Sequence, residues 1–189
     1  YAGRKAPFLN NCYLLRLLDD TREEWAGLTQ RAMSCLMTGG GIGVDISVCR
    51  PSGRVLERTG GISSGPLPLL YTINEVGRNV MQGGSRRSAM YGSMDSSHDD
   101  IWKFLHAKNW GDIPVKGAFN GDGTPMTVAD AKREDFNYPA PLDMMNIRVN
   151  YSDNWLNGND NDVFMENCRQ AMKSGEPGFS FNFGDKKDE

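Results

Sequence analysis

The sequence predicts an α/β domain whose strands pair largely in parallel. Short apolar segments typical of strands alternate along the chain with segments whose apolar residues recur at helical spacing. The chain has 189 residues, which is enough for one domain with its own core or for part of a larger one. Apolar residues make up 39% and charged residues 24%, and both values are typical of globular proteins.

The first part of the chain contains two predicted strands and a helix between them. Residues 11–18 are apolar enough for a strand. Thr21 and Glu24 have the spacing of a capping box, which starts a helix that we expect to end at Gly39. Apolar residues then alternate along 42–49, which predicts the next strand.

Two further helices are predicted around a short strand. Ser63 or Ser64 is expected to cap a helix that ends at the glycine pair 83–84. A short strand follows at 90–95, and Ser97 is expected to cap the next helix. This order continues the alternation of strand and helix.

The last part of the chain begins with a long excursion. Residues 109–142 are rich in Gly, Pro, Asp and Asn, which favours an irregular segment with a small hairpin. The pattern then predicts a strand at 145–150, a helix at 162–174 that ends at Gly175, and a final strand at 178–183.

Composition excludes several classes of protein. The net charge of -3 argues against direct nucleic-acid binding, and no apolar run approaches the roughly 18 residues of a membrane span. The four cysteines lack the spacing of a metal site, so no metal is predicted, and they fit a reducing, cytoplasmic setting. The chain starts without Met and ends in a charged segment, so we expect it to be truncated at both ends.

Two loops rich in arginine and glycine are candidate anion sites. Residues 50–62 hold three arginines and three glycines, and residues 82–90 read QGGSRRSAM. Guanidinium groups suit phosphate, whereas the alternative for each loop is a solvated polar turn. A glycine run at 38–46 has two interpretations as well. It is either a helix end with tight backbone packing, or a place where Gly40 and Gly41 let a ligand lie against bare backbone.

The order of the motifs resembles the catalytic chain of ribonucleotide reductase over nearly the whole sequence. The segments that carry this resemblance, in chain order, are NNCYLLRLLDD, TGGGIGVDISVCRPSG, RTGGISSGP, NVMQGGSRRSAMYG and HDDIWKFLHAKN. GGISSGP and QGGSRRSAM look most like the adenosylcobalamin-dependent branch, class II. The large chain of class I shares most of this framework and is the alternative.

The resemblance implies a partial ten-stranded α/β barrel, with residues 1–189 forming a single partial catalytic domain. It implies a part of a ribonucleoside-diphosphate or triphosphate reductase that makes deoxyribonucleotides by thiyl-radical chemistry. The implied cofactor is adenosylcobalamin, for which no binding residue is assigned. The implied partners are a ribonucleotide substrate, a deoxynucleoside triphosphate effector, a thioredoxin-type reductant, the remaining part of the catalytic chain and a second copy bound through helices 21–38 and 65–81.

The same resemblance assigns roles to individual residues. Cys12 matches the first cysteine of the reducing pair, a redox-active thiol, and the matched substrate positions are Asn11, Gly40 and Gly41. The matched effector positions are Asp20, Thr21, Arg22, Met37, Arg50, Glu57 and Arg58. The matched specificity loop, which passes the identity of the effector to the substrate base, consists of Gln82, Gly83, Gly84, Ser85, Arg86 and Arg87.

Two other functions stay open from the sequence. The radical cysteine and the second reducing cysteine of the family belong downstream of Glu189, so this segment alone is not expected to catalyse reduction. A non-catalytic nucleotide-binding module would keep both arginine loops without the chemistry. An α/β domain whose arginines are only solvated would bind no triphosphate.

Overall fold

A five-stranded sheet forms the centre of the computed structural model, which describes residues 12–57, 60–80 and 89–184. Each pair of neighbouring strands in this sheet is parallel. The strands lie side by side in their chain order, which is β1 (Cys12–Arg16), β2 (Gly41–Asp45), β3 (Met90–Asp95), β6 (Asn146–Tyr151) and β7 (Gly178–Phe181). The prediction of an α/β fold with parallel pairing is confirmed.

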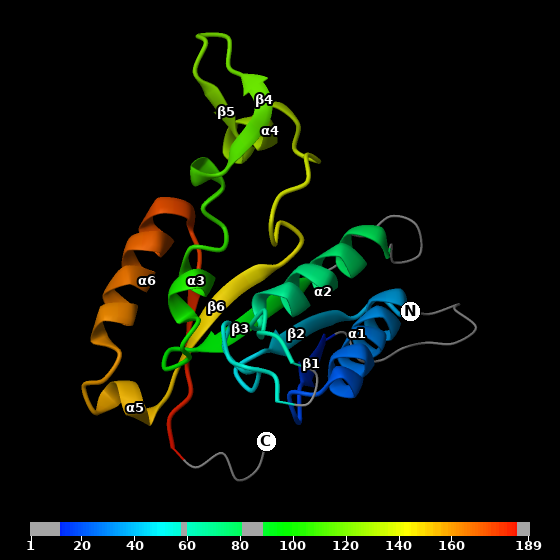
Figure 1. Cartoon of the computed structure of the whole chain (residues 1–189), viewed down its shortest axis with the longest axis vertical. Helices are drawn as coiled ribbons and strands as arrows, with labels where there is room; N and C mark the ends of the chain where they lie inside the picture. The colour runs from blue at the N-terminus through cyan, green and yellow to red at the C-terminus, as the bar shows by residue number, and fades with distance from the viewer. Residues whose placement is uncertain (1–11, 58–59, 81–88, 185–189) are drawn as a thin grey trace, which may run out of the picture.

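The helices cover one face of this sheet (Figure 1). They are α1 (Arg22–Met37), α2 (Leu67–Asn79), α3 (Ile101–Leu105), α5 (Asp153–Leu156) and α6 (Asn161–Ser174). Each crossover steps to the next strand in the same direction, and such crossovers are right-handed, so they place their helices on the same side. This winding in one direction is that of an α/β barrel segment.

The alternation of side chains along β3 shows which face is covered. A Cβ on Gly92 would lie 2.9 Å from Leu70 Cδ1 of α2, so Gly92 faces the helices. Its neighbours Tyr91 and Ser93 therefore point to the opposite, open face. The covered face carries the apolar core, whose fully buried members include Leu28, Leu36, Val44, Leu70, Ile73, Met94, Phe104 and Val149.

The excursion between α3 and β6 forms a small unit that stands away from the sheet in Figure 1. It contains the 3-10 turn η1 (Trp110–Asp112), the antiparallel hairpin of β4 (Pro114–Phe119) and β5 (Pro125–Thr127), and helix α4 (Val128–Glu134). Thr127 and Asp130 form a complete capping box at the start of α4. The predicted hairpin within 109–142 is confirmed.

Two helix ends are formed by the residues that the sequence indicates. The Thr21 hydroxyl accepts a hydrogen bond from the Glu24 backbone N–H at 3.1 Å, which starts α1. Only this half of the expected capping box forms, because the Glu24 carboxylate instead accepts from the Leu18 backbone N–H and from Arg31. At the other end of the chain, Gly175 closes α6 in the left-handed conformation, with φ of 82°.

Two predicted caps are wrong. Helix α2 has Pro66 at its N-cap and no capping side chain, because the Ser63 hydroxyl accepts from the Gly65 backbone N–H instead. The Ser97 hydroxyl donates to the Asp95 carboxylate at 2.7 Å, so α3 starts only at Ile101. In both places a polar side chain closes a turn before the helix rather than capping it.

Two element ends also differ from the prediction. Strand β2 stops at Asp45, whose carboxylate accepts from the Ser47 backbone N–H at 3.0 Å and turns the chain away from the sheet. The expected strand over 42–49 is therefore shorter. Helix α2 ends at Asn79 and not at the glycine pair 83–84, because Val80 is already extended.

Candidate functional site

The described members of the predicted substrate site lie at the end of the sheet where the strands begin. Cys12 is the first residue of β1, is exposed, and pairs with Gly41 at the start of β2. The next residue, Ile42, donates its backbone N–H to Ala89 O at 2.9 Å and pairs with Met90. The residues that follow the predicted specificity loop therefore lie at the same end of the sheet as Cys12 and Gly41.

Gly40 packs tightly against the first strand. A Cβ on Gly40 would lie 2.3 Å from Tyr13 Cε2, and the Gly40 backbone N–H donates to Cys35 O at 3.1 Å. Bare backbone is needed here for the contact between the end of α1 and β1, which favours the packing interpretation of the glycine run. Binding of a ligand by Gly40 stays a prediction.

Part of the predicted site lies outside the described residues. These residues are Asn11, Arg58 and the specificity loop Gln82, Gly83, Gly84, Ser85, Arg86 and Arg87. Their roles stay predictions from the resemblance.

The cysteines differ in their surroundings. Cys49 is buried, and its burial together with the nearby carboxylates of Asp20 and Asp45 raises the pKa of its thiol to about 12. Burial also raises the pKa of Cys35, which packs against the core. Cys12 is exposed, whereas Cys168 on α6 is partly buried. Cys49 and Cys35 therefore have the character of packing residues, whereas the redox role of the exposed Cys12 stays a prediction.

The predicted effector residues Asp20 and Arg50 meet where the first two strands end. The Arg50 side chain donates to Asp20 through Nε, and its Nη2 donates to Asp20 O at 2.9 Å. The Arg50 backbone N–H and Trp25 Nε1 donate to the same carboxylate, at 3.1 Å and 2.9 Å. Trp25 is not among the residues that the sequence singles out for a site.

These contacts fix the charge of Asp20. Burial alone would raise the pKa of Asp20, but the hydrogen bonds from Arg50 and Trp25 lower the pKa below its ordinary value. The Arg50 side chain keeps 41% of its surface exposed. The arrangement is a guanidinium that is oriented by a carboxylate on one side and open to solvent on the other, which suits an incoming phosphate.

The first arginine loop is anchored to α3. The Ser52 backbone N–H and hydroxyl both donate to the Asp100 carboxylate at 2.6 Å, and Lys103 donates to the same carboxylate at 2.9 Å. Burial would raise the pKa of Asp100, but these donors lower it. Within the described part of the loop, Glu57 is exposed. Asp100 is not among the residues that the sequence singles out, because its contact with the loop joins residues 48 apart.

The remaining effector positions are not all brought together. Thr21 caps α1 next to Asp20, and Arg22 is exposed beside Glu23 at 3.7 Å. Met37 lies at the other end of α1, roughly 22 Å further along the helix at 1.5 Å per residue, and is 62% exposed. Met37 therefore lies near the end of the sheet where Gly40 lies and not with Arg50.

The open face of the sheet carries a stacked pair that sequence reasoning also missed. The Arg148 guanidinium lies over the Tyr91 ring at 4.3 Å from its centroid. A Cβ on Gly43 would lie 2.3 Å from the same ring, so the glycine makes room for it. No local signal marks this pair, because the two residues lie on different strands and meet only through the register of β3 and β6.

Two kinds of site do not occur in the part of the chain that the structure describes. No three His, Cys, Asp or Glu side chains are grouped so that they could hold a metal ion. Among the same residues, no helix has the length and apolar character needed to cross a membrane.

A comparison with protein families matches residues 10–138 to the family described as "Ribonucleotide reductase, barrel domain". This match covers more than half of the chain. The chain belongs to this ribonucleotide reductase family. The parallel sheet in Figure 1, with its strands in chain order, agrees with a segment of such a barrel.

Several curated proteins are similar to part of this chain. The zebrafish (Danio rerio) ribonucleoside-diphosphate reductase large subunit is 38% identical over 113 residues, and that of vaccinia virus (strain Copenhagen) is 36% identical over 110 residues. The large chain of Schizosaccharomyces pombe is 32% identical over 111 residues. Each alignment covers 57% of this chain, and it spans only 13% to 14% of the relative.

A solved structure supports the fold over most of the chain. The Actinobacillus ureae class Id ribonucleotide reductase alpha subunit superposes with a TM-score of 0.61 at 16% identity, covering 90% of this chain and 26% of that one. The expectation of adenosylcobalamin is wrong, because the curated relatives are large subunits of the class I type, which work without that cofactor. The class II placement loses its support for the same reason.

Proposed function

We propose that this chain is the first part of the catalytic barrel of a class I ribonucleoside-diphosphate reductase large subunit. The observation that carries the proposal is the register at the start of the sheet. It sets the exposed Cys12 beside Gly41, and it sets Ile42 beside the residues that follow the predicted specificity loop. A thiol, a bare backbone strand and the end of an arginine loop are thus neighbours at one end of the sheet.

The chemistry assigned to Cys12 is the supply of reducing equivalents. Cys12 and a second cysteine, contributed by the remainder of the barrel, give up two electrons and two protons and close a disulfide. The ribose 2′-hydroxyl leaves as water, so a ribonucleotide and a dithiol become a deoxyribonucleotide, a disulfide and water. A dithiol protein of the thioredoxin type restores the pair by thiol–disulfide exchange. The exposure of Cys12 supports its access to such a partner.

The effector function is assigned to the opposite end of the sheet, where the strands finish. Arg50 is held by Asp20 and presents its exposed side to solvent, which supports binding of a triphosphate there. Along β1 the two ends are separated by roughly 13 Å, at about 3.3 Å per residue from Cys12 to Arg16. The effector and the substrate are thus assigned to separate binding sites, and the segment 82–87 is proposed to connect the two sites.

The test is nucleotide reduction by the full-length large subunit together with its small subunit. Wild-type protein is expected to reduce a ribonucleoside diphosphate in the presence of a dithiol, and Cys12→Ser is expected to abolish repeated turnover. Cys168→Ser is the matched control and is expected to retain activity, since its helix α6 connects β6 to β7, at the other end of the strand order from β1. Turnover by Cys12→Ser at the wild-type rate would contradict the assigned role.

Effector binding is tested separately. Arg50→Met is expected to weaken binding of a deoxynucleoside triphosphate by about tenfold to a hundredfold, since charge-assisted hydrogen bonds to phosphate contribute roughly 1.5 to 3 kcal/mol. Arg169→Met, which removes an exposed arginine of α6 that pairs with Glu166 and is not among the predicted effector positions, is the control. Triphosphate binding without any reduction in the complete enzyme would instead support a non-catalytic nucleotide-binding module.

A further inference from the structure

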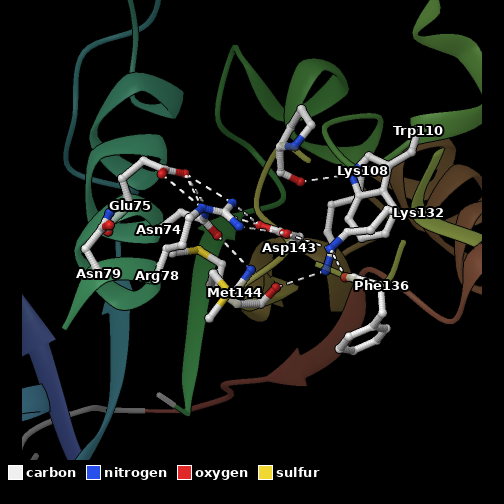
Figure 2. A network of polar contacts seen from close by, with 12 residues as sticks. Asn74, Glu75, Arg78, Asn79, Lys108, Trp110, Lys132, Phe136, Asp143 and Met144 are labelled. Atoms are coloured by element: carbon white, nitrogen blue, oxygen red, sulfur yellow. Dashed lines mark hydrogen bonds and ion pairs between the residues drawn. The ribbon is translucent and has the colours of Figure 1, made fainter. Parts of the chain in front are cut away.

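A buried ionic cluster joins the hairpin unit to the end of α2 (Figure 2). Its centre is Asp143, whose side chain is only 2% exposed. Arg78 of α2 donates to this carboxylate through both Nη1, at 3.2 Å, and Nη2. Lys132 of α4 donates to it at 2.8 Å from the other side. One buried carboxylate is therefore shared by two cations from different parts of the chain.

Each partner is itself held in place. Arg78 also donates from Nε to Glu75 on its own helix at 3.0 Å, and Lys132 donates to Phe136 O at 2.8 Å. Asn74, which is 1% exposed, accepts from the Met144 backbone N–H at 2.9 Å. The last turns of α2 are thus tied at two points to the segment that returns from the hairpin unit.

The hairpin unit is closed behind this cluster. Trp110 Nε1 donates to Pro141 O at 2.9 Å, which joins the outgoing and returning segments of the excursion. Lys108 and Lys132 lie over the Trp110 ring at 5.4 Å and 5.8 Å from its centroid. Figure 2 shows Trp110 and Lys132 on one side of Asp143 and Arg78 on the other. The outgoing and returning segments of the excursion are therefore joined to each other next to Asp143.

The cluster lies next to the chain segment that the proposed function assigns to specificity. Helix α2 ends at Asn79, one residue after Arg78, and residues 82–87 follow shortly after it. On the other side of Asp143, Asn146 starts β6 and pairs with Tyr91 of β3, close to where that segment ends. Both ends of the specificity segment are thus connected to positions within a few residues of the cluster.

We propose that Asp143 is a positioning residue for substrate selection: it fixes the end of α2 and thereby sets how the effector changes the choice of substrate. This inference rests on the proposed reductase function and extends it, because no effector or substrate contact is assigned to Asp143. A buried carboxylate with two cations has one favoured geometry, since any displacement leaves a buried charge unpaired. The hairpin unit supplies Lys132 and so contributes to that geometry from outside the sheet.

The experiment compares Asp143→Asn with wild type in the full-length large subunit with its small subunit. The preference between two ribonucleoside diphosphates, as a ratio of kcat/KM values, is measured with each of two deoxynucleoside triphosphate effectors. In wild type the ratio is expected to change when the effector is exchanged. In Asp143→Asn that change is expected to shrink by about tenfold, which is within the usual range of coupling between sites.

Two further readouts separate positioning from general damage. The Kd of the effector is expected to stay within about twofold, because Asp20 and Arg50 are untouched, and turnover without effector is expected to stay within about threefold. The control Asp122→Asn removes an exposed carboxylate in the turn of the same hairpin, where it accepts from Thr124, and should leave the effector response unchanged. A structural defect would alter all three quantities together.

The outcomes decide between the claims. An unchanged effector response in Asp143→Asn overturns the positioning role. If that variant does not fold, Arg78→Lys, which keeps the charge but loses the two-pronged contact, is measured in its place and has to give the same loss. A wild-type enzyme that shows no effector-dependent preference removes the proposed function itself, a result that is seen before any variant is made.

Discussion

Replacing Asp143 by Asn is expected to loosen the attachment between α2 and the returning segment of the hairpin unit. The substitution keeps the size of the side chain but removes its charge, so Arg78 and Lys132 then face each other across a neutral amide. The pKa of Arg78 is raised above its ordinary value mainly by its hydrogen bonds to Asp143 and Glu75. Loss of the carboxylate therefore leaves a strongly stabilised cation without its main partner.

The size of the effect follows from the pKa of Asp143. Burial alone would raise this pKa, but the hydrogen bonds from Arg78, Lys132 and Asn74 lower it from 3.8 to about 2. At roughly 1.4 kcal/mol per unit of pKa, the ionised form is stabilised by about 2 kcal/mol in the folded state. Breaking a buried ion pair from one side costs about 3 to 5 kcal/mol in other proteins, so a loss of about 2 to 4 kcal/mol is expected here.

The assay is hydrogen exchange of the Met144 backbone amide, which is bonded to the Asn74 side chain, in the full-length protein. A loss of about 2 to 4 kcal/mol corresponds to exchange that is roughly 30-fold to 1,000-fold faster at neutral pH. Asp122→Asn is the control and should leave this amide unchanged. Exchange that rises by less than about threefold in Asp143→Asn would refute the reasoning from the buried charge.

The same argument fixes a dependence on pH. The pKa of Asp143 is lower in the folded state than in the open state, so ionisation stabilises the folded state above about pH 4. As the pH falls from about 5 to about 2, Asp143 takes up a proton first in the open form. The difference between wild type and Asp143→Asn in the free energy of local opening, measured by exchange of the Met144 amide, therefore disappears. A difference between the two proteins that stays constant over this range contradicts the assignment of the pKa.

Three further predictions concern packing. Tyr151→Phe removes the hydroxyl that accepts from Asn167 Nδ2 at 3.0 Å, and should cost about 1 to 3 kcal/mol, measured by hydrogen exchange of α6. Gly43→Ala places a Cβ 2.3 Å from the Tyr91 ring and should lower the free energy of unfolding by about 1 to 3 kcal/mol. When Tyr91 is already replaced by Ala, adding Gly43→Ala should cause no further loss. With a pKa of about 12 against an ordinary 9.0, Cys49 should react with iodoacetamide at pH 8 about a thousandfold more slowly than an exposed thiol, as measured by mass spectrometry.

The parts of the fold that were predictable from the sequence depend on local signals. Thr21 and Gly175 act within one helix turn, so their residue types alone identify the ends of α1 and α6. The run of short apolar segments likewise predicts the parallel sheet, because strands buried under helices must be apolar. Ser97 misled for a local reason, since Asp95 two residues earlier accepts its hydroxyl first.

The candidate site depends on contacts that no local pattern shows. Arg78 and Asp143 are 65 residues apart, and Asp20 and Arg50 are 30 apart. The resemblance supplied Asp20 and Arg50 by position, but it offered nothing for Asp143, which lies in the Gly- and Pro-rich excursion. Its charge looked like that of an ordinary solvated loop residue until the fold placed two cations beside it.

The order of the strands has a consequence for how this chain folds during synthesis. Since β1, β2, β3, β6 and β7 lie side by side in the order in which they are made, each new strand that leaves the ribosome finds its partner already at the free edge. Among the strands that the structure describes, none has to be inserted between two that have already paired. This sheet can therefore grow one strand at a time in the direction of synthesis, and each new strand covers the edge that was free before it.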